Sequence, residues 1–243
     1  MYRELDALDF PALTDLYAPP VTAAPWLRVN FVSSADGAVE VDGDSQALSG
    51  PDDMRVFKIL RMRCDVLLVG AGTVRTDGYR PLRLSADRVA WRRDHGLCDH
   101  PVMAVVSRGA DLKLDAPLFT DAPVRPLVVT GADAPPERLA AAAEVADVIS
   151  TGTGGVDFAD ALRLLRSRGL AQVLCEGGPH VFGEITAAGL VDELCLTLSP
   201  KLAGAGSGRI TAGPPSSLRS MRLAHVLHAN GNLLLRYVRP DPG

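Results

Sequence analysis

The chain has 243 residues, of which 47% are hydrophobic, and a formal net charge of −4 at pH 7. That length and apolar content allow a substantial core within one domain. The acidic balance and the lack of any run of lysine and arginine argue against nucleic acid as a partner, because proteins that bind it gather positive charge on one face.

The N-terminus favours a cytoplasmic protein, and the cysteines show no metal-site or disulfide pattern. The first residues, MYRELDALDF, lack the basic start and the long apolar run of a secretory signal or a membrane span. The four cysteines are far apart and form no C-x-x-C pair, which suits neither a zinc site nor a disulfide framework. We expect all four to be reduced core residues, and we expect no metal site.

In chain order, residues 1–25 come first and end in the proline-punctuated YAPPVTAAP. We predict that they form an N-terminal arm, either extended over the domain or partly disordered. Regular structure is predicted to begin near Trp26, and residues 26–243 are predicted to form a single domain.

From Trp26 onward, apolar runs of strand length alternate with stretches of helical period. Ser49, Asp133 and Asp157 each precede a helical stretch, where short polar side chains favour a helix start. The alternation predicts an α/β fold with a mostly parallel sheet and crossover helices. The predicted strands are WLRVNFVS, DVLLVG, PVMAVVS, RPLVVT, ADVIS, AQVLCE and ELCLTLS.

The end of the chain has a different pattern. MRLAHVLHANGNLLLRYVR consists of two apolar runs on either side of Asn230-Gly231. Asn-Gly readily adopts the positive φ angles of a tight two-residue turn. We therefore predict a C-terminal antiparallel hairpin.

Two glycine-rich turns compete as a phosphate-binding site. VLLVGAGTVRTDG suggests a dinucleotide fingerprint, but Arg75 stands where G-x-G-x-x-G requires its third glycine. In LCEGGPHVFGEI, Gly177 and Gly178 allow close backbone approach, and a helix opening at Pro179 would direct unpaired N–H groups at an anion. These glycines are equally compatible with a plain strand-to-helix connection.

Three longer blocks carry a family resemblance: NFVSSADGAVEVDGDSQALSGPDD, LRMRCDVLLVGAGTVRTDGYRPL and CEGGPHVFGEITAAGLVDELCLTLSPKLAGAG. They are similar, in the same order, to the signature blocks of the pyrimidine reductase of riboflavin biosynthesis, the reductase half of the bacterial bifunctional deaminase-reductase. The resemblance covers Trp26 to the C-terminus and implies a dihydrofolate-reductase-like fold, NADPH as cofactor and a homodimer. The H-x-E and P-C-x-x-C pattern of the deaminase half is absent, so we expect a stand-alone reductase domain.

The resemblance also implies roles for individual residues. Glu176 is the expected catalytic group. The expected substrate-binding residues are Ser45, Arg61, Arg83 and Glu176. The expected cofactor-binding residues are Asn30, Val32, Thr73, Asp77, Ser107, Arg108, Gly177, Gly178, Pro179, His180, Val181, Phe182, Gly183 and Glu184.

Several of these roles have a structural alternative. Arg108 suits the 2′-phosphate of NADPH through its fork of donors, yet it also suits an ordinary surface charge. Glu176 could accept hydrogen bonds from substrate donors, or could only complement the dipole of the next helix. Arg61 could lie on the solvated face of its helix. Asp36-Gly37 is predicted to be a turn, with Asp36 as a supporting group.

Two departures from the family pattern lie beside the expected substrate pocket: Ala47, where some relatives have tryptophan, and DGYRPL in place of DDPxL. They bear on the identity of the substrate more than on the reaction. The resemblance implies hydride transfer from NADPH to C1′ of 5-amino-6-(5-phosphoribosylamino)uracil, a phosphorylated pyrimidine, to give the ribitylamino product.

Three alternatives stay open from the sequence. The same fold and cofactor could reduce a dihydropterin or dihydrofolate. The chain could be a non-catalytic module that keeps NADPH binding but has lost its acceptor site. It could also be a Rossmann dehydrogenase that uses Gly70 and Gly72.

Overall fold

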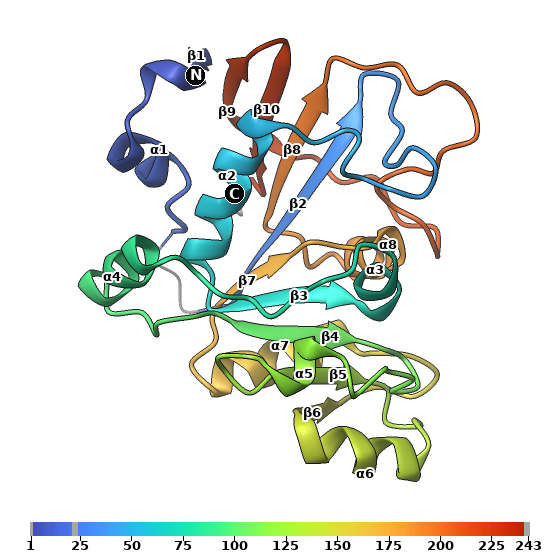
Figure 1. Ribbon diagram of the computed structural model, residues 1–243. Helices are drawn as coiled ribbons and strands as arrows, with labels where there is room; N and C mark the ends of the chain where they lie inside the picture. The colour runs from blue at the N-terminus through green and yellow to red at the C-terminus, as the bar shows by residue number, and fades with distance from the viewer. Residues whose placement is uncertain (1, 21–23, 241–243) are drawn as a thin grey trace. The chain divides into compact units, whose positions relative to one another are not determined.

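The computed structural model describes residues 2–20 and 24–240 (Figure 1). The chain forms two compact units. Unit 1 comprises residues 2–20, 26–60 and 175–240, and unit 2 comprises residues 24–25 and 61–174. Within these described ranges, no helix combines the length and apolarity that crossing a bilayer requires.

Unit 1 contains both ends of the described chain. Its strands lie in the order β1-β9-β10-β8-β2, with β2 parallel to β8 and with β10 antiparallel to both β8 and β9. Helix α2 begins in unit 1 and ends in unit 2. The elements are β1 (Tyr2–Glu4), η1 (Leu5–Ala7), α1 (Phe10–Leu16), β2 (Trp26–Ser34), α2 (Pro51–Arg63), α8 (Pro179–Ala187), β8 (Glu193–Ser199), β9 (Arg222–Ala229) and β10 (Asn232–Val238).

Unit 2 is built around strands in the order β7-β3-β4-β5-β6, and its β3–β4, β4–β5 and β5–β6 ladders are parallel. All residues of β3 and β5 are buried, as is typical of parallel strands covered on both faces. The elements are β3 (Val66–Gly70), α3 (Ala71–Thr76), α4 (Ala86–Asp94), β4 (Val102–Val106), α5 (Pro117–Thr120), β5 (Leu127–Thr130), α6 (Pro136–Val145), β6 (Asp147–Ser150), α7 (Phe158–Ser167) and β7 (Gln172–Cys175).

The predicted fold class is confirmed: the sheet ladders are mostly parallel, and the C-terminal hairpin turns at Asn230 and Gly231, whose φ angles are 48° and 81°. The segment before Trp26 is not simply extended, because it contains α1 and a strand, β1, that pairs with β9. Residues 1 and 21–23 of the predicted arm lie outside the described residues. The single-domain boundary at residues 26–243 stays a prediction.

Two local predictions were wrong. Asp133 does not cap α6, whose N-cap is Pro135; the Asp133 carboxylate instead accepts a hydrogen bond from the Gly154 N–H. The cysteines are free thiols, but Cys98 is exposed whereas the other three are buried. By contrast, Asp157 caps α7 by accepting from the Asp160 N–H at 3.0 Å, as predicted.

A buried carboxylate ties three strands of unit 1 together. Glu193 of β8 accepts from Arg28 of β2 at 2.7 Å and from Arg236 of β10 at 2.8 Å. The two guanidinium groups also donate to backbone carbonyls near the end of α1, Arg28 to Tyr17 and Arg236 to Ala18. This charged cluster, here called the Glu193 clamp, therefore fixes the N-terminal helix on the sheet.

The Glu193 clamp should make the free energy of unfolding depend on pH. Burial alone would raise the pKa of Glu193, but the charges of Arg28 and Arg236 outweigh it and hold the pKa at about 2. The pKa of a glutamate carboxyl group in an unfolded chain is about 4.3. The stabilisation is thus complete above about pH 4.5 and is lost as the pH falls toward about 2.

We predict that Glu193→Gln lowers the free energy of unfolding by about 3–5 kcal/mol at pH 7, since the buried Arg28 and the half-buried Arg236 lose their counterion. Urea denaturation at pH 7 and at low pH measures the effect, which should shrink as the pH falls. Asp99→Asn, which removes an exposed pair with Arg93, is the control and should change little. Equal effects of the two substitutions would contradict the assigned role of the clamp.

Candidate active site

The stretch from Glu176 to Gly183 forms a strand-to-helix turn in unit 1. It leads from the end of β7 into α8, which begins at Pro179 as predicted, with Gly178 as its N-cap residue. Gly177 has a φ of +93°, in the region that favours glycine. The turn therefore leaves backbone groups at a helix N-terminus without intervening side chains, which is an arrangement suited to an anionic ligand.

Close packing on both sides fixes this turn. A Cβ placed on Gly177 would lie 2.8 Å from Cζ of Phe31, whose ring stacks on Phe182 of α8 with centroids 5.2 Å apart. A Cβ placed on Gly183 would collide with the carbonyl oxygen of Ala212. The Ala212 N–H donates to the Pro179 carbonyl at 3.0 Å, so the segment around Ala212 lies directly on the start of α8.

Glu176 is buried, and a second buried carboxyl group, Asp53 of α2, interacts with it. Ser49 donates to Asp53 at 2.5 Å, and Thr197 of β8 also forms a hydrogen bond with it. Burial raises the pKa of Asp53, and the negative charge of Glu176 raises it further. The two groups form a buried carboxyl pair in which the neighbouring charge favours the protonated form of Asp53.

Asp53 is not among the site residues predicted from the sequence. Its signal was present in GPDD, but acids in a first helical turn are usually explained by the helix dipole. The neighbouring Asp52 has a different role, since it accepts hydrogen bonds from Asn230 and Asn232 beside the hairpin turn. Its interactions with Ser49, Thr197 and Glu176 distinguish Asp53 from Asp52.

Asn30 and Val32 lie on the α2 side of β2. Their register partners are Cys195 and Thr197, whereas Phe31 between them points to the α8 side. Both residues therefore share a face with Asp53 and not with the glycines of the turn. His180 is exposed, while Val181, Glu184 and Pro179 are half-buried and Phe182 is buried.

Asp36 organises the loops of unit 1. Its carboxylate accepts from the Ser34 hydroxyl and from the N–H groups of Gly204 and Ala203, and these bonds hold its pKa at about 2. The turn at Gly37 is as predicted, with a φ of +92°. The loop that carries half-buried Ser45 is thus joined to the loop after β8, a connection that Lys201 reinforces by donating to the Ala47 carbonyl.

Unit 2 brings together another part of the predicted set. Thr73 lies in α3 and its carbonyl accepts from the N–H of Asp77, the residue that ends the helix. The Arg61 guanidinium lies 5.5 Å from the ring centroid of Tyr79, so Arg61 is not a simply solvated side chain. Gly72 lies inside α3, and a Cβ placed on it would have no neighbouring atom within 4 Å.

The remaining predicted residues of unit 2 lie on loops. Arg83 is exposed and its guanidinium donates to the carbonyl and the carboxylate of Asp121 at 2.6 and 2.8 Å. Ser107 and Arg108 follow β4, where the Ser107 hydroxyl accepts from the Asp111 N–H at 3.1 Å. Arg108 is exposed. No cluster of three metal-ligating side chains occurs among residues 2–20 and 24–240.

The buried thiol beside the turn is not suited to nucleophilic chemistry. Burial raises the pKa of Cys175 to about 12, so the group is a neutral thiol at physiological pH. In unit 1 the groups gathered at the turn are thus a carboxyl pair, backbone amides and apolar rings. That set can bind and orient a ligand and can exchange a proton, but it supplies no nucleophile.

We predict that Gly183→Ala destabilises the protein by about 1–3 kcal/mol, because its methyl group overpacks the contact with Ala212. Thermal unfolding measures the change. Gly72→Ala is the matched control, since it adds a methyl group to open space in a helix and should be neutral or slightly stabilising. A Gly183→Ala protein as stable as the control would show that the turn tolerates a side chain.

Comparisons with known proteins found relatives in both sequence and fold. A relative from Methanothermobacter thermautotrophicus, 2,5-diamino-6-ribosylamino-4(3H)-pyrimidinone 5′-phosphate reductase, is 31% identical over 76% of this chain and 82% of its own length. A crystal structure of a pyrimidine reductase-like protein from Corynebacterium diphtheriae has a TM-score of 0.84 at 26% identity and covers 95% of this chain and 99% of that one.

A dihydrofolate reductase from Enterococcus faecalis shares the fold, with a TM-score of 0.52 at 15% identity over 89% of this chain and 97% of that one. This likeness confirms the expected dihydrofolate-reductase-like fold and contradicts a Rossmann architecture. The family model of the RibD C-terminal domain matches residues 25–235. The chain belongs to the RibD C-terminal domain family.

Proposed function

We propose that the protein is an NADPH-dependent reductase of riboflavin biosynthesis that acts on a ribosylaminopyrimidine 5′-phosphate. The observation that carries this proposal is the buried Glu176 carboxylate placed immediately before a glycine turn and a helix N-terminus, in a chain of the RibD C-terminal domain family. A carboxylate and an anion-binding turn are the two groups that a pyrimidine phosphate and a dinucleotide require.

The cofactor proposal rests on two groups of residues. In unit 1, the turn from Gly177 to Glu184 suits a diphosphate, because Gly177 and Gly178 carry no side chains of their own at the N-terminus of α8. In unit 2, Thr73, Asp77, Ser107 and Arg108 are the proposed contacts, with Arg108 on the 2′-phosphate. Asn30 and Val32 are proposed to contact the nicotinamide side from β2. NADPH, when bound, supplies the hydride.

Two phosphorylated pyrimidines are the candidate substrates. The expected one is 5-amino-6-(5-phosphoribosylamino)uracil, and the archaeal relative is named for a 2,5-diamino-pyrimidinone. The two differ at C2 of the ring, which carries an oxo group in the first and an amino group in the second. In both, reduction at C1′ opens the ribose and gives the ribitylamino product.

We propose that Glu176 contacts the substrate and accepts hydrogen bonds from its hydroxyl or amide donors. Asp53 is the neighbouring carboxyl group, and its raised pKa favours its neutral form beside Glu176. Ser45, Arg61 and Arg83 are the proposed partners of the sugar phosphate. Arg83 would have to leave its ion pair with Asp121 before it could contact the phosphate.

Two alternatives differ from this proposal in measurable ways. A pterin reductase on the same fold would oxidise NADPH with dihydrofolate and not with the pyrimidine phosphates. A non-catalytic module would bind NADPH and oxidise it with none of these acceptors. The free cysteines of the chain support a reducing, cytoplasmic location for any of the three.

We predict that Glu176→Gln lowers kcat/KM for the pyrimidine phosphate by about 10–100-fold, the effect of losing hydrogen bonds to a charged group. NADPH oxidation followed by absorbance measures it. Glu144→Gln, an exposed substitution on α6, is the control and should leave turnover unchanged. A Gly178→Val variant should fail to bind NADPH. Unchanged turnover in Glu176→Gln would overturn the role of this carboxylate.

We also propose that the protein is a homodimer. Cross-strand pairs Leu196 with Leu235, and Leu198 with Leu233, share one face of the β8–β10 ladder and are half-buried or exposed. Such a contiguous apolar face is typical of an interface between protein chains. A second copy of the chain is the partner that the family resemblance implies.

We predict that Leu235→Glu converts the dimer to a monomer, because it buries a charge in the interface. Sedimentation velocity at several concentrations tests this. Leu218→Glu places the same charge on a fully exposed loop residue and should leave the assembly unchanged. A wild-type protein that is monomeric at all concentrations would contradict the proposal.

A further inference from the structure

The ends of β4 and β5 lie side by side in unit 2. The Ser107 N–H donates to the Val129 carbonyl at 3.0 Å, and the Gly131 N–H donates to the Arg108 carbonyl at 3.0 Å. Both strands run in the same direction, so these residues lie at the carboxyl edge of a parallel sheet. That edge is where open α/β sheets bind their ligands.

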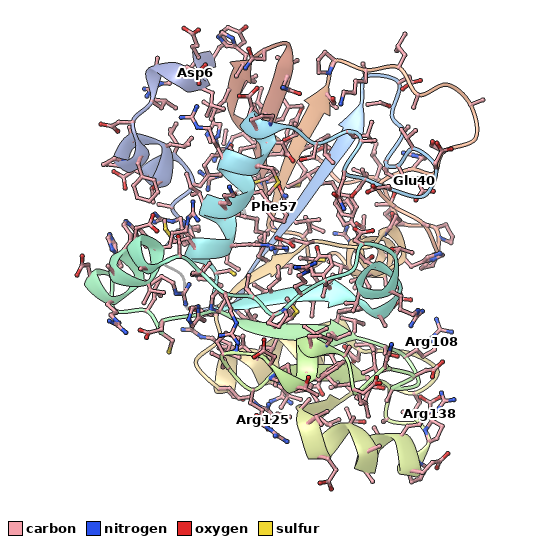
Figure 2. The ribbon with its side chains drawn as sticks, viewed as in Figure 1. Asp6, Glu40, Phe57, Arg108, Arg125 and Arg138 are labelled. Atoms are coloured by element: carbon pink, nitrogen blue, oxygen red, sulfur yellow. The ribbon has the colours of Figure 1, made fainter. Side chains whose placement is uncertain are left out.

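A second guanidinium group reaches the same edge. Arg138, in the first turn of α6, donates to the Gly109 carbonyl at 3.4 Å, and its Nη2 lies 3.9 Å from the Asp111 carboxylate. Figure 2 shows Arg108 and Arg138 extending at one end of unit 2, whereas Arg125 extends at the opposite end. Two permanent positive charges are therefore presented beside the loop that follows β4.

Three glycines line the backbone near these charges, and the Asp133 carboxylate lies beside one of them, with Oδ1 2.7 Å from a Cβ position on Gly131. Gly109, Gly131 and Gly155 come from three different loops, and Nε of Arg108 lies 3.9 Å from a Cβ position on Gly155. A Cβ on Gly131 would lie 3.1 Å from the Arg108 carbonyl and 3.2 Å from the Gly155 carbonyl. The loops that carry Gly131 and Gly155 thus pack closely through their backbones, and the side chains of Arg108 and Arg138 lie beside these loops.

We propose that Arg138 binds the 2′-phosphate of NADPH together with Arg108, and that Arg138 thereby helps to select the phosphorylated cofactor over NADH. This inference rests on the proposed function. Arginine suits the role because its planar fork of donors matches a phosphate, and because a dianion gains from two neighbouring positive charges.

The acidic groups near Arg138 do not prevent this. The Asp111 side chain is 81% exposed, and its 3.9 Å contact with Arg138 is at the limit of an ion pair. Exposed pairs of this kind contribute little, so a phosphate can replace Asp111 as the partner. Asp133 lies beside Gly131 and accepts from the Gly154 N–H at 3.0 Å, so a backbone donor offsets part of its charge.

The test compares NADP⁺ with NAD⁺, which differ only by the 2′-phosphate, by titration calorimetry. We expect Arg138→Gln to weaken NADP⁺ binding about tenfold and to leave NAD⁺ binding unchanged, as for the loss of one charge-assisted contact. Arg138→Lys should lie between the two. Arg125→Gln is the matched control, because Arg125 instead donates to Asp147 and to carbonyls at the end of α6.

The outcomes separate the two proposals. If the wild-type protein prefers NADP⁺ and Arg138→Gln retains that full preference, or loses both ligands equally, the role of Arg138 is overturned while the proposed cofactor stands. If the wild-type protein shows no preference for NADP⁺, the cofactor assignment falls and this inference falls with it. Thermal unfolding of each variant, expected to match wild type, shows that any loss of binding is not a loss of folding.

Discussion

The arrangement of unit 1 depends on the charge of Glu193, held between Arg28 and Arg236 in the interior. A buried carboxylate requires its partners in place, because an uncompensated charge there is costly. The clamp joins β2, β8 and β10, and so fixes the registers that carry Phe31 and Thr197. Phe31 packs against Gly177 of the turn, and Thr197 bonds to Asp53. Both sides of the candidate site thus follow from one electrostatic constraint.

Strong local signals in the sequence predicted much of the fold. The apolar runs, the Asn230-Gly231 turn and the start of α8 at Pro179 are determined by residues close together in the chain. The helix in residues 10–16 was not predicted, although it has a local start signal, in which Asp9 accepts from the Ala12 N–H and Pro11 lies in the first turn. Asp133 was predicted to mark the start of α6, but the N-cap residue is Pro135. The Asp133 carboxylate instead accepts a hydrogen bond from the Gly154 N–H in another loop.

The candidate site was predictable where a motif carried it and not where contacts between distant segments did. The glycine turn and Glu176 could be found from CEGGP. The reason for Gly183 could not, because the carbonyl of Ala212 that excludes a side chain belongs to a loop far along the chain. Asp53 and Arg138 were missed for the same reason: each resembles an ordinary charge in a first helical turn until its neighbours are known.

The central claim is hydride transfer from NADPH to C1′ of a ribosylaminopyrimidine 5′-phosphate. The most direct measurement supplies NADPH deuterated at C4 of the nicotinamide, on each face in turn, with the 2-oxo or the 2-amino pyrimidine, and locates the label in the product by mass spectrometry and NMR. The account predicts one deuterium at C1′ of a ribitylamino product, from one face only. A product without deuterium at C1′ would contradict it.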